Sequence, residues 1–151
     1  MIFLPLFILG AMLVALFRWV TYRQSEDRFY RLAWLVFLVG VFLLFWGNGA
    51  VGIIGASSHD VNMLYNALLG VGVLGAVGLR RHRLLLALMM LILDFLMLLI
   101  LAAALVGDWG MSGPKWPLDA VILTVFFSGF WSASAVLFYL SNQRRIRLGL
   151  G

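Results

Sequence analysis

A single carboxylate lies in the most apolar stretch of the chain, where the sequence around Asp94 reads MMLILDFLMLL. A charged side chain near the centre of a membrane helix costs roughly 2.5–3.5 kcal/mol on insertion scales, so we expect it to have a partner or a function. Three roles fit Asp94: a structural hydrogen bond to another helix, a contact with a partner subunit, and a proton or ion site. The hydroxyl and amide side chains that could bond to it within the chain are Thr124, Ser128, Ser132 and Asn48.

Two glycine-rich stretches match G-x-G-x-x-G, namely GNGAVG at 47–52 and GVGVLG at 70–75. A dinucleotide-binding turn needs a strand before these glycines and a helix opening after them. GVGVLG lies wholly inside an apolar run and GNGAVG closes one, so we expect no nucleotide to bind. Small residues instead allow membrane helices to approach closely. The residues expected at such contacts are Gly52, Ala56, Gly72, Ala76, Ser128, Gly129, Ser132 and Ala133.

Polar side chains also gather on either side of the short stretch GASSHDVN. If the flanking apolar runs form an antiparallel hairpin, Asn48 and Asn66 fall at similar depth, with Asn62 and Tyr65 close by. Buried amides in lipid seek hydrogen-bond partners. This cluster is therefore expected either to clamp two helices or to line a polar pocket near the outer surface. No cofactor is predicted, although such a pocket would suit a lipid, a quinone or a pigment.

Other site chemistry has little support in the sequence. The chain has no cysteine, which excludes disulfides and thiolate chemistry. His59 and His82 fall in loops expected on opposite sides of a membrane, and no H-E-x-x-H or other metal-ligand cluster occurs. We therefore predict no catalytic residue and no metal site, and consider an enzyme the less favoured class.

Composition indicates the elements that position these residues. The 151 residues are 64% hydrophobic and 11% charged, whereas soluble domains are about 25% charged. A helix that crosses a bilayer needs about 20 apolar residues. The chain is therefore predicted to be an all-α, polytopic integral membrane protein with one membrane domain, residues 1–151. Its five predicted transmembrane helices are 2–22, 32–52, 61–79, 84–106 and 118–140.

The arginines predict the orientation. All ten lie close to the end of the first, third or fifth span or to the start of the second or fourth, whereas Lys115 falls on the opposite side. The positive-inside rule places the arginine side in the cytoplasm, which gives an N-out/C-in topology. Arginines beside membrane spans are topology signals, so we predict no nucleic acid partner and expect contact with membrane lipids.

The stretch GNGAVGIIG at 47–55, followed by N-M-L-Y at 62–65, resembles a signature of small uncharacterised bacterial multi-pass membrane proteins. The resemblance continues into the fifth span and covers roughly residues 32–140. It implies a four-helix unit plus an extra N-terminal helix in the bacterial cytoplasmic (inner) membrane, with no known activity, and a neutral residue is usual near Asp94. The fifth-span residues that carry it are Phe126, Phe127, Trp131 and Ser134.

Three functions fit these features. We expect a non-catalytic integral membrane subunit that is an accessory or scaffolding component of a larger membrane protein complex, with other integral membrane subunits as partners. The first alternative is a small transporter or proton- or ion-conducting protein that uses Asp94. The second is a lipid-, quinone- or pigment-binding membrane protein that uses the region of Asn48, Tyr65 and Asn66.

Overall fold

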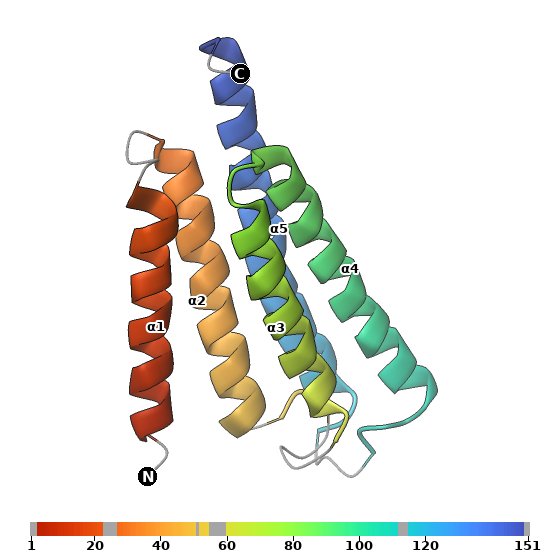
Figure 1. The fold of residues 1–151 in the computed structure, drawn as a ribbon. Coiled ribbons are helices and arrows are strands. Elements are labelled where there is room, and N and C mark those ends of the chain that lie inside the picture. The colour runs from red at the N-terminus through yellow and green to blue at the C-terminus, as the bar shows by residue number, and fades with distance from the viewer. Residues whose placement is uncertain (1–2, 23–26, 51, 55–59, 112–114, 150–151) are drawn as a thin grey trace.

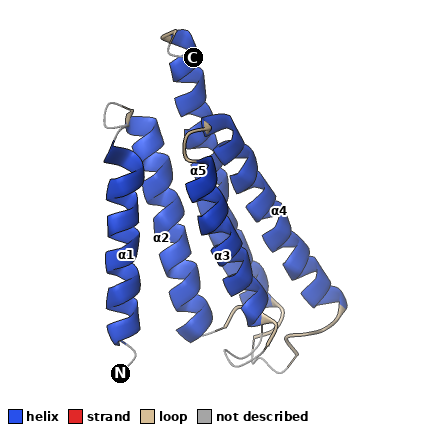
Figure 2. Ribbon diagram, in the orientation of Figure 1, coloured by secondary structure: helices blue, strands red, loops and turns tan. Residues whose placement is uncertain are grey.

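The computed structural model describes residues 3–22, 27–50, 52–54, 60–111 and 115–149. Over these residues the chain is all-helical and contains no strand (Figure 2). Each of the five helices is long and apolar enough to cross a membrane. The helices are α1 (Phe3–Thr21), α2 (Arg28–Ala50), α3 (Asn62–Leu79), α4 (Arg83–Val106) and α5 (Leu118–Arg147).

The helices overlap the five predicted spans but do not share all their ends. The main difference is α5, which continues to Arg147 instead of stopping near residue 140. This added length is about two helical turns and is polar. Apolar composition predicts only the part of a helix that suits lipid, so it does not predict where the helix ends. The backbone of α5 leaves the helical region near Gly149, whose φ is 66°.

The chain runs up and down, so that α1, α3 and α5 end where α2 and α4 begin (Figure 1). The N-terminal and C-terminal parts of the chain consequently lie at opposite ends of the bundle (Figure 1). We call the end that holds the last turns of α1, α3 and α5 the arginine end. The arginines described there are Arg18, Arg28, Arg31, Arg80, Arg81, Arg83, Arg144, Arg145 and Arg147.

The centre of the bundle is formed by α2, α4 and α5, because α5 packs extensively against both of the others. Aromatic rings fill this centre: Trp34 contacts Phe37 and Phe138 edge to face, with ring centroids 5.8 and 5.9 Å apart. Trp131, in the middle of α5, is 1% exposed and donates its Nε1–H to Met97 Sδ at 3.3 Å. It is therefore a packed core ring. In contrast, α1 lies at the edge of the bundle beside α2 (Figure 1).

The closest helix approach in the centre occurs at Gly40 of α2. A Cβ atom added there would lie 2.8 Å from Cβ and 3.1 Å from Cγ of Phe130 on α5. Atoms so close to the backbone of α5 cannot rotate away, so this contact needs a glycine. The sequence analysis did not select Gly40, because it stands alone in an apolar run without a second small residue four positions away.

Candidate functional site

Asp94 joins α4 to α5 through two hydroxyl groups. Ser128 Oγ donates to Asp94 Oδ1 at 2.5 Å, and Ser132 Oγ donates to Asp94 Oδ2 at 2.7 Å. The two serines are four residues apart and therefore lie on one face of α5. Asp94 itself is 9% exposed. Both carboxylate oxygens thus accept interhelical hydrogen bonds, and the carboxylate faces into the bundle.

The other two predicted partners of Asp94 lie elsewhere. Asn48 is on α2 near the end of the bundle opposite the arginine end, where its amide bonds to α3. Thr124 is fully buried beside Tyr65 of α3. Thr124 lies four residues before Ser128 and therefore on the same side of α5, so its depth along the helix, and not its face, separates it from Asp94.

Asn62, the first residue of α3, holds the segment that follows α2. Its Oδ1 accepts the backbone N–H groups of Ile53 and Ile54 at 3.1 and 3.0 Å, and its Nδ2 donates to the carbonyl of Ile54 at 3.3 Å. Ile53 and Ile54 are 1% and 0% exposed. The asparagine side chain therefore satisfies backbone groups that are buried outside any helix, which would otherwise be costly.

Gly52 completes this turn rather than a helix contact. Its φ is 79°, and its N–H bonds back to the carbonyls of Gly47 and Asn48. A glycine in the left-handed region after the last helical residue is a common way to end a helix. The GNGAVG motif therefore closes α2, and its expected partner Ala56 lies outside the described residues.

The remaining outer polar residues separate into a clamp and a buried pair. Asn48 Nδ2 donates to the Asn62 carbonyl at 2.8 Å and to Asn66 Oδ1 at 3.1 Å, which ties α2 to α3. Tyr65 and Thr124 are fully buried, and their side chains interact with one another inside the bundle. Only Asn66 is exposed toward the outside of the bundle. The geometry thus makes Asn48 a clamp between α2 and α3, while Asn66 also lines an open groove beside α1.

The positions expected at close helix contacts also differ from one another. Gly72 faces Leu93 of α4, since an added Cβ would lie 3.0 Å from Leu93 Cδ1, and Ala76 is fully buried. Gly129 is exposed, and an added Cβ there would meet no atom within 4 Å. Ala133 is exposed as well. The closely packed face of α5 is therefore the one that carries Phe130. Ser128 and Ser132 instead donate hydrogen bonds to Asp94.

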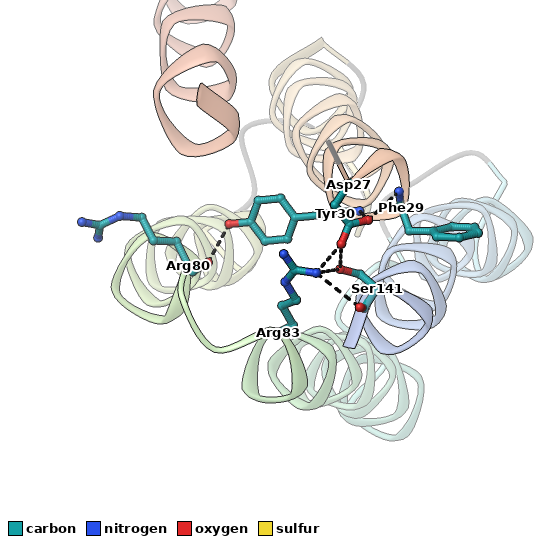
Figure 3. Close-up of polar contacts among 6 residues, drawn as sticks. All are labelled: Asp27, Phe29, Tyr30, Arg80, Arg83 and Ser141. Atoms are coloured by element: carbon teal, nitrogen blue, oxygen red, sulfur yellow. Dashed lines mark hydrogen bonds and ion pairs between the residues drawn. The ribbon is translucent and has the colours of Figure 1, made fainter. Parts of the chain in front are cut away.

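A third polar cluster, at the arginine end, joins α2, α4 and α5 (Figure 3). Arg83 forms an ion pair with Asp27, and its Nη1 also donates to Ser141 Oγ at 2.8 Å and to the Ser141 carbonyl at 3.3 Å. Ser141 Oγ in turn donates to Asp27 Oδ2 at 2.8 Å. The side chains of Arg83 and Asp27 are only 8% and 12% exposed. We call these three residues the inner latch.

The inner latch also organises the start of α2. Asp27 Oδ1 accepts the backbone N–H groups of Phe29 and Tyr30 at 3.1 and 3.2 Å, which is the bonding of a helix N-cap (Figure 3). The Arg83 guanidinium lies over the Tyr30 ring, with its Cζ 5.2 Å from the ring centroid. The Tyr30 hydroxyl donates to the Arg80 carbonyl at 2.6 Å. The end of α3 is thereby held to the start of α2.

The inner latch is not evident from the sequence, where Arg83 stands beside other arginines that signal topology. One local signal was available: Asp27 precedes the apolar run of α2 at the position where a carboxylate caps a helix. The pairing with Arg83 and Ser141 joins residues 56 and 114 positions apart in sequence. No spacing rule connects such distant positions.

Metal-ligand chemistry has no cluster to support it within the described part of the chain, where no three His, Asp or Glu side chains come together. The comparisons with models of protein families, with curated proteins and with solved structures return no match to this chain. The resemblance drawn from GNGAVGIIG and N-M-L-Y therefore stays a prediction, and function has to be argued from the geometry.

Proposed function

We propose that this protein is a non-catalytic integral membrane subunit that acts as an accessory or scaffolding component of a larger membrane complex. In this proposal it crosses the bacterial cytoplasmic membrane five times, with its N-terminus outside and its C-terminus inside. The nine described arginines at one end of the bundle, with Lys115 at the other, support this orientation through the positive-inside rule.

The observation that carries the proposal is the position of α1. Only 17% of the residues in its apolar window are buried within the protein, compared with 44% in α2. Leu4, Phe7 and Ile8 are 69%, 76% and 53% exposed. Ala11 is exposed one turn beyond Phe7, so a small side chain follows the large ones along this face. Small residues of this kind allow another membrane helix to pack closely.

The hydrogen bonding of the interior supports a structural role. Asp94, Asn48, Asn62 and the inner latch each bond two or more segments of the chain together. A proton or ion pathway needs a carboxylate that is free to exchange its partners, whereas both oxygens of Asp94 accept serine hydroxyls. These interactions favour a rigid scaffold over a transporter.

The experiment that tests the proposal is native mass spectrometry of the affinity-purified protein, extracted from its own membranes in mild detergent. We expect other integral membrane subunits to co-purify in a fixed ratio. Ala11→Trp, which adds bulk to the exposed face of α1, should remove them. Ala102→Trp, at an exposed position of α4, is the matched control and should retain them. A lone monomer or homo-oligomer from wild-type membranes would overturn the proposal.

The transporter alternative has its own test. Proton flux into liposomes that contain the purified protein should equal the flux into empty liposomes, for both the wild type and Asp94→Asn. A wild-type flux that Asp94→Asn abolishes would favour conduction over the accessory role.

A further inference from the structure

An apolar groove runs along the membrane-facing side of the bundle between α1 and α3, with residues of α2 at its base. Its volume is about 650 Å³. The groove exists because α1 packs beside α2 and leaves a gap toward α3. We call it the α1–α3 groove. Among the side chains that line it are Leu9, Leu13, Leu16, Val41, Leu69 and Val73.

A second hollow of about 880 Å³ lies at the arginine end, and Trp19 lines both the groove and this hollow. Arginines from α1, from the turn after α3 and from α5 surround this hollow, and none of the described residues that line it is acidic. We call it the basic mouth. Its arginines are Arg18, Arg80, Arg81 and Arg145.

One of these arginines is held in place at the junction. The Arg80 guanidinium lies over the Trp19 ring, 4.5 Å from the centroid, and its Nη1 donates to the Val77 carbonyl at 2.9 Å. Tryptophan is favoured where hydrocarbon meets the polar headgroups. The junction of groove and mouth therefore has the chemistry of the membrane interface.

The length of the groove matches one leaflet. Along α1 it extends from Leu9 to Trp19, a rise of about 15 Å at 1.5 Å per residue. This is half of a hydrocarbon core that is about 30 Å thick. An acyl chain that starts at Trp19 would thus extend along the groove to about the bilayer midplane.

We propose that the α1–α3 groove binds an anionic phospholipid of the cytoplasmic leaflet, with an acyl chain along the groove and the phosphate headgroup among the arginines of the basic mouth. Arginine suits this role because its planar guanidinium donates paired hydrogen bonds to phosphate oxygens. Basic pockets between membrane helices on the cytoplasmic side are a known mode of binding anionic headgroups. The assignment to the cytoplasmic leaflet rests on the proposed orientation. The residues of the lipid site differ from those of the exposed face of α1 that is proposed to bind a partner.

A partner helix fits this space less well than a lipid. A helix would have to supply several acidic residues at its end to match the charge of the basic mouth. An anionic phospholipid combines a narrow apolar chain with a charged head in one molecule.

The test is native mass spectrometry of the purified protein after exchange into micelles that contain equal amounts of phosphatidylglycerol and phosphatidylcholine. We expect the wild type to retain phosphatidylglycerol at least five-fold more than phosphatidylcholine. Gly70→Leu should fill the groove without disturbing the fold, because an added Cβ at Gly70 meets no atom within 4 Å. It should lower phosphatidylglycerol retention about ten-fold. Gly129→Leu is the matched control, since Gly129 is equally open but lies outside the groove, and it should behave as the wild type.

A second pair of variants tests the headgroup site. Arg81→Gln with Arg145→Gln removes charge from the basic mouth and should abolish the preference for phosphatidylglycerol. Arg144→Gln with Arg147→Gln removes the same charge from positions that do not line the mouth and should preserve the preference. Glycerol phosphate, which lacks acyl chains, should not displace the lipid.

Three results would overturn the lipid site. One is equal retention of both lipids by the wild type. Another is equal retention by Gly70→Leu and Gly129→Leu. The third is displacement by glycerol phosphate, which would indicate a soluble phosphate ligand. Co-purification of protein subunits is a separate readout, so the accessory role and the lipid site can fail independently.

Discussion

At the scale of single residues, the buried polar groups act as fasteners between helices. Asp94 bonds α4 to α5, Asn62 holds the segment after α2, and Arg83 anchors the inner latch. Each interhelical hydrogen bond in a membrane contributes about 0.6 kcal/mol on average. The larger effect is the cost of leaving such a group buried without a partner. Substitutions that orphan a charge should therefore destabilise more than substitutions that remove it.

The Asp94 clamp provides one test of this asymmetry. The double variant Ser128→Ala, Ser132→Ala leaves the carboxylate in an apolar site and should lower the free energy of unfolding by about 2–3 kcal/mol. Asp94→Leu should cost less than about 1 kcal/mol, because the freed serines can bond to carbonyls of their own helix. The triple variant Asp94→Leu, Ser128→Ala, Ser132→Ala should recover most of the free energy of unfolding that the double variant loses. Unfolding by sodium dodecyl sulfate in mixed micelles, monitored by circular dichroism, measures the stability of all three variants. Equal losses of stability for the double variant and Asp94→Leu would contradict the expectation.

The inner latch provides a second test at the residue scale. Arg83→Leu leaves Asp27, which is 12% exposed, without its counter-ion and should lower the free energy of unfolding by about 3 kcal/mol. Arg147→Leu removes the same charge from an exposed position at the end of α5 and should change stability by less than about 0.5 kcal/mol. The same unfolding assay compares them. Similar values for the two variants would show that the latch is only a surface charge pair.

At the scale of helices, small residues matter where backbones approach, and the sequence alone does not show where that is. Gly40 lies against Phe130, whereas Gly129, the neighbour of Phe130 in sequence, is open to the outside of the bundle. Both glycines lie inside apolar runs. They differ because only one of them is on the face where α2 and α5 meet.

Gly40→Ala should consequently lower the free energy of unfolding by about 1–3 kcal/mol, since the added methyl group overlaps the Phe130 Cβ. Gly129→Ala should leave stability unchanged or raise it by up to about 1 kcal/mol, because alanine favours a helix more than glycine does. Thermal unfolding in detergent distinguishes the pair. Gly40→Ala at wild-type stability would mean that α2 and α5 can separate without loss.

At the scale of the whole molecule, the proposed role depends on five crossings and on the side of the membrane that holds the arginines. The described arginines lie at one end of the bundle and Lys115 at the other. The basic mouth shares the arginine end, where Trp19 joins it to the α1–α3 groove. The proposed topology and the proposed lipid site therefore involve the same end of the bundle.

Topology can be measured directly because the chain contains no cysteine. In intact cells, a membrane-impermeant maleimide should label Lys115→Cys and should leave Arg147→Cys unlabelled until the membrane is permeabilised. The positive-inside rule gives this direction. The reverse pattern would place the arginine end outside, and labelling of both variants in intact cells would contradict a membrane crossing by α5.

The sequence by itself determined the five apolar helices and the side on which the arginines gather. Both are local properties, because the length of an apolar run and the charge at its ends do not depend on what the run packs against. The sequence also supplied the candidates around Asp94 and Asn48, since polar groups in lipid are conspicuous. Only the tertiary structure decided that Ser128 and Ser132 bind Asp94 and that Asp27, Arg83 and Ser141 form a latch. It alone placed Gly40 against Phe130 and left a groove between α1 and α3. The physical reason is that the rotation of each helix about its axis, and its choice of neighbours, arise from side-chain packing between segments distant in sequence.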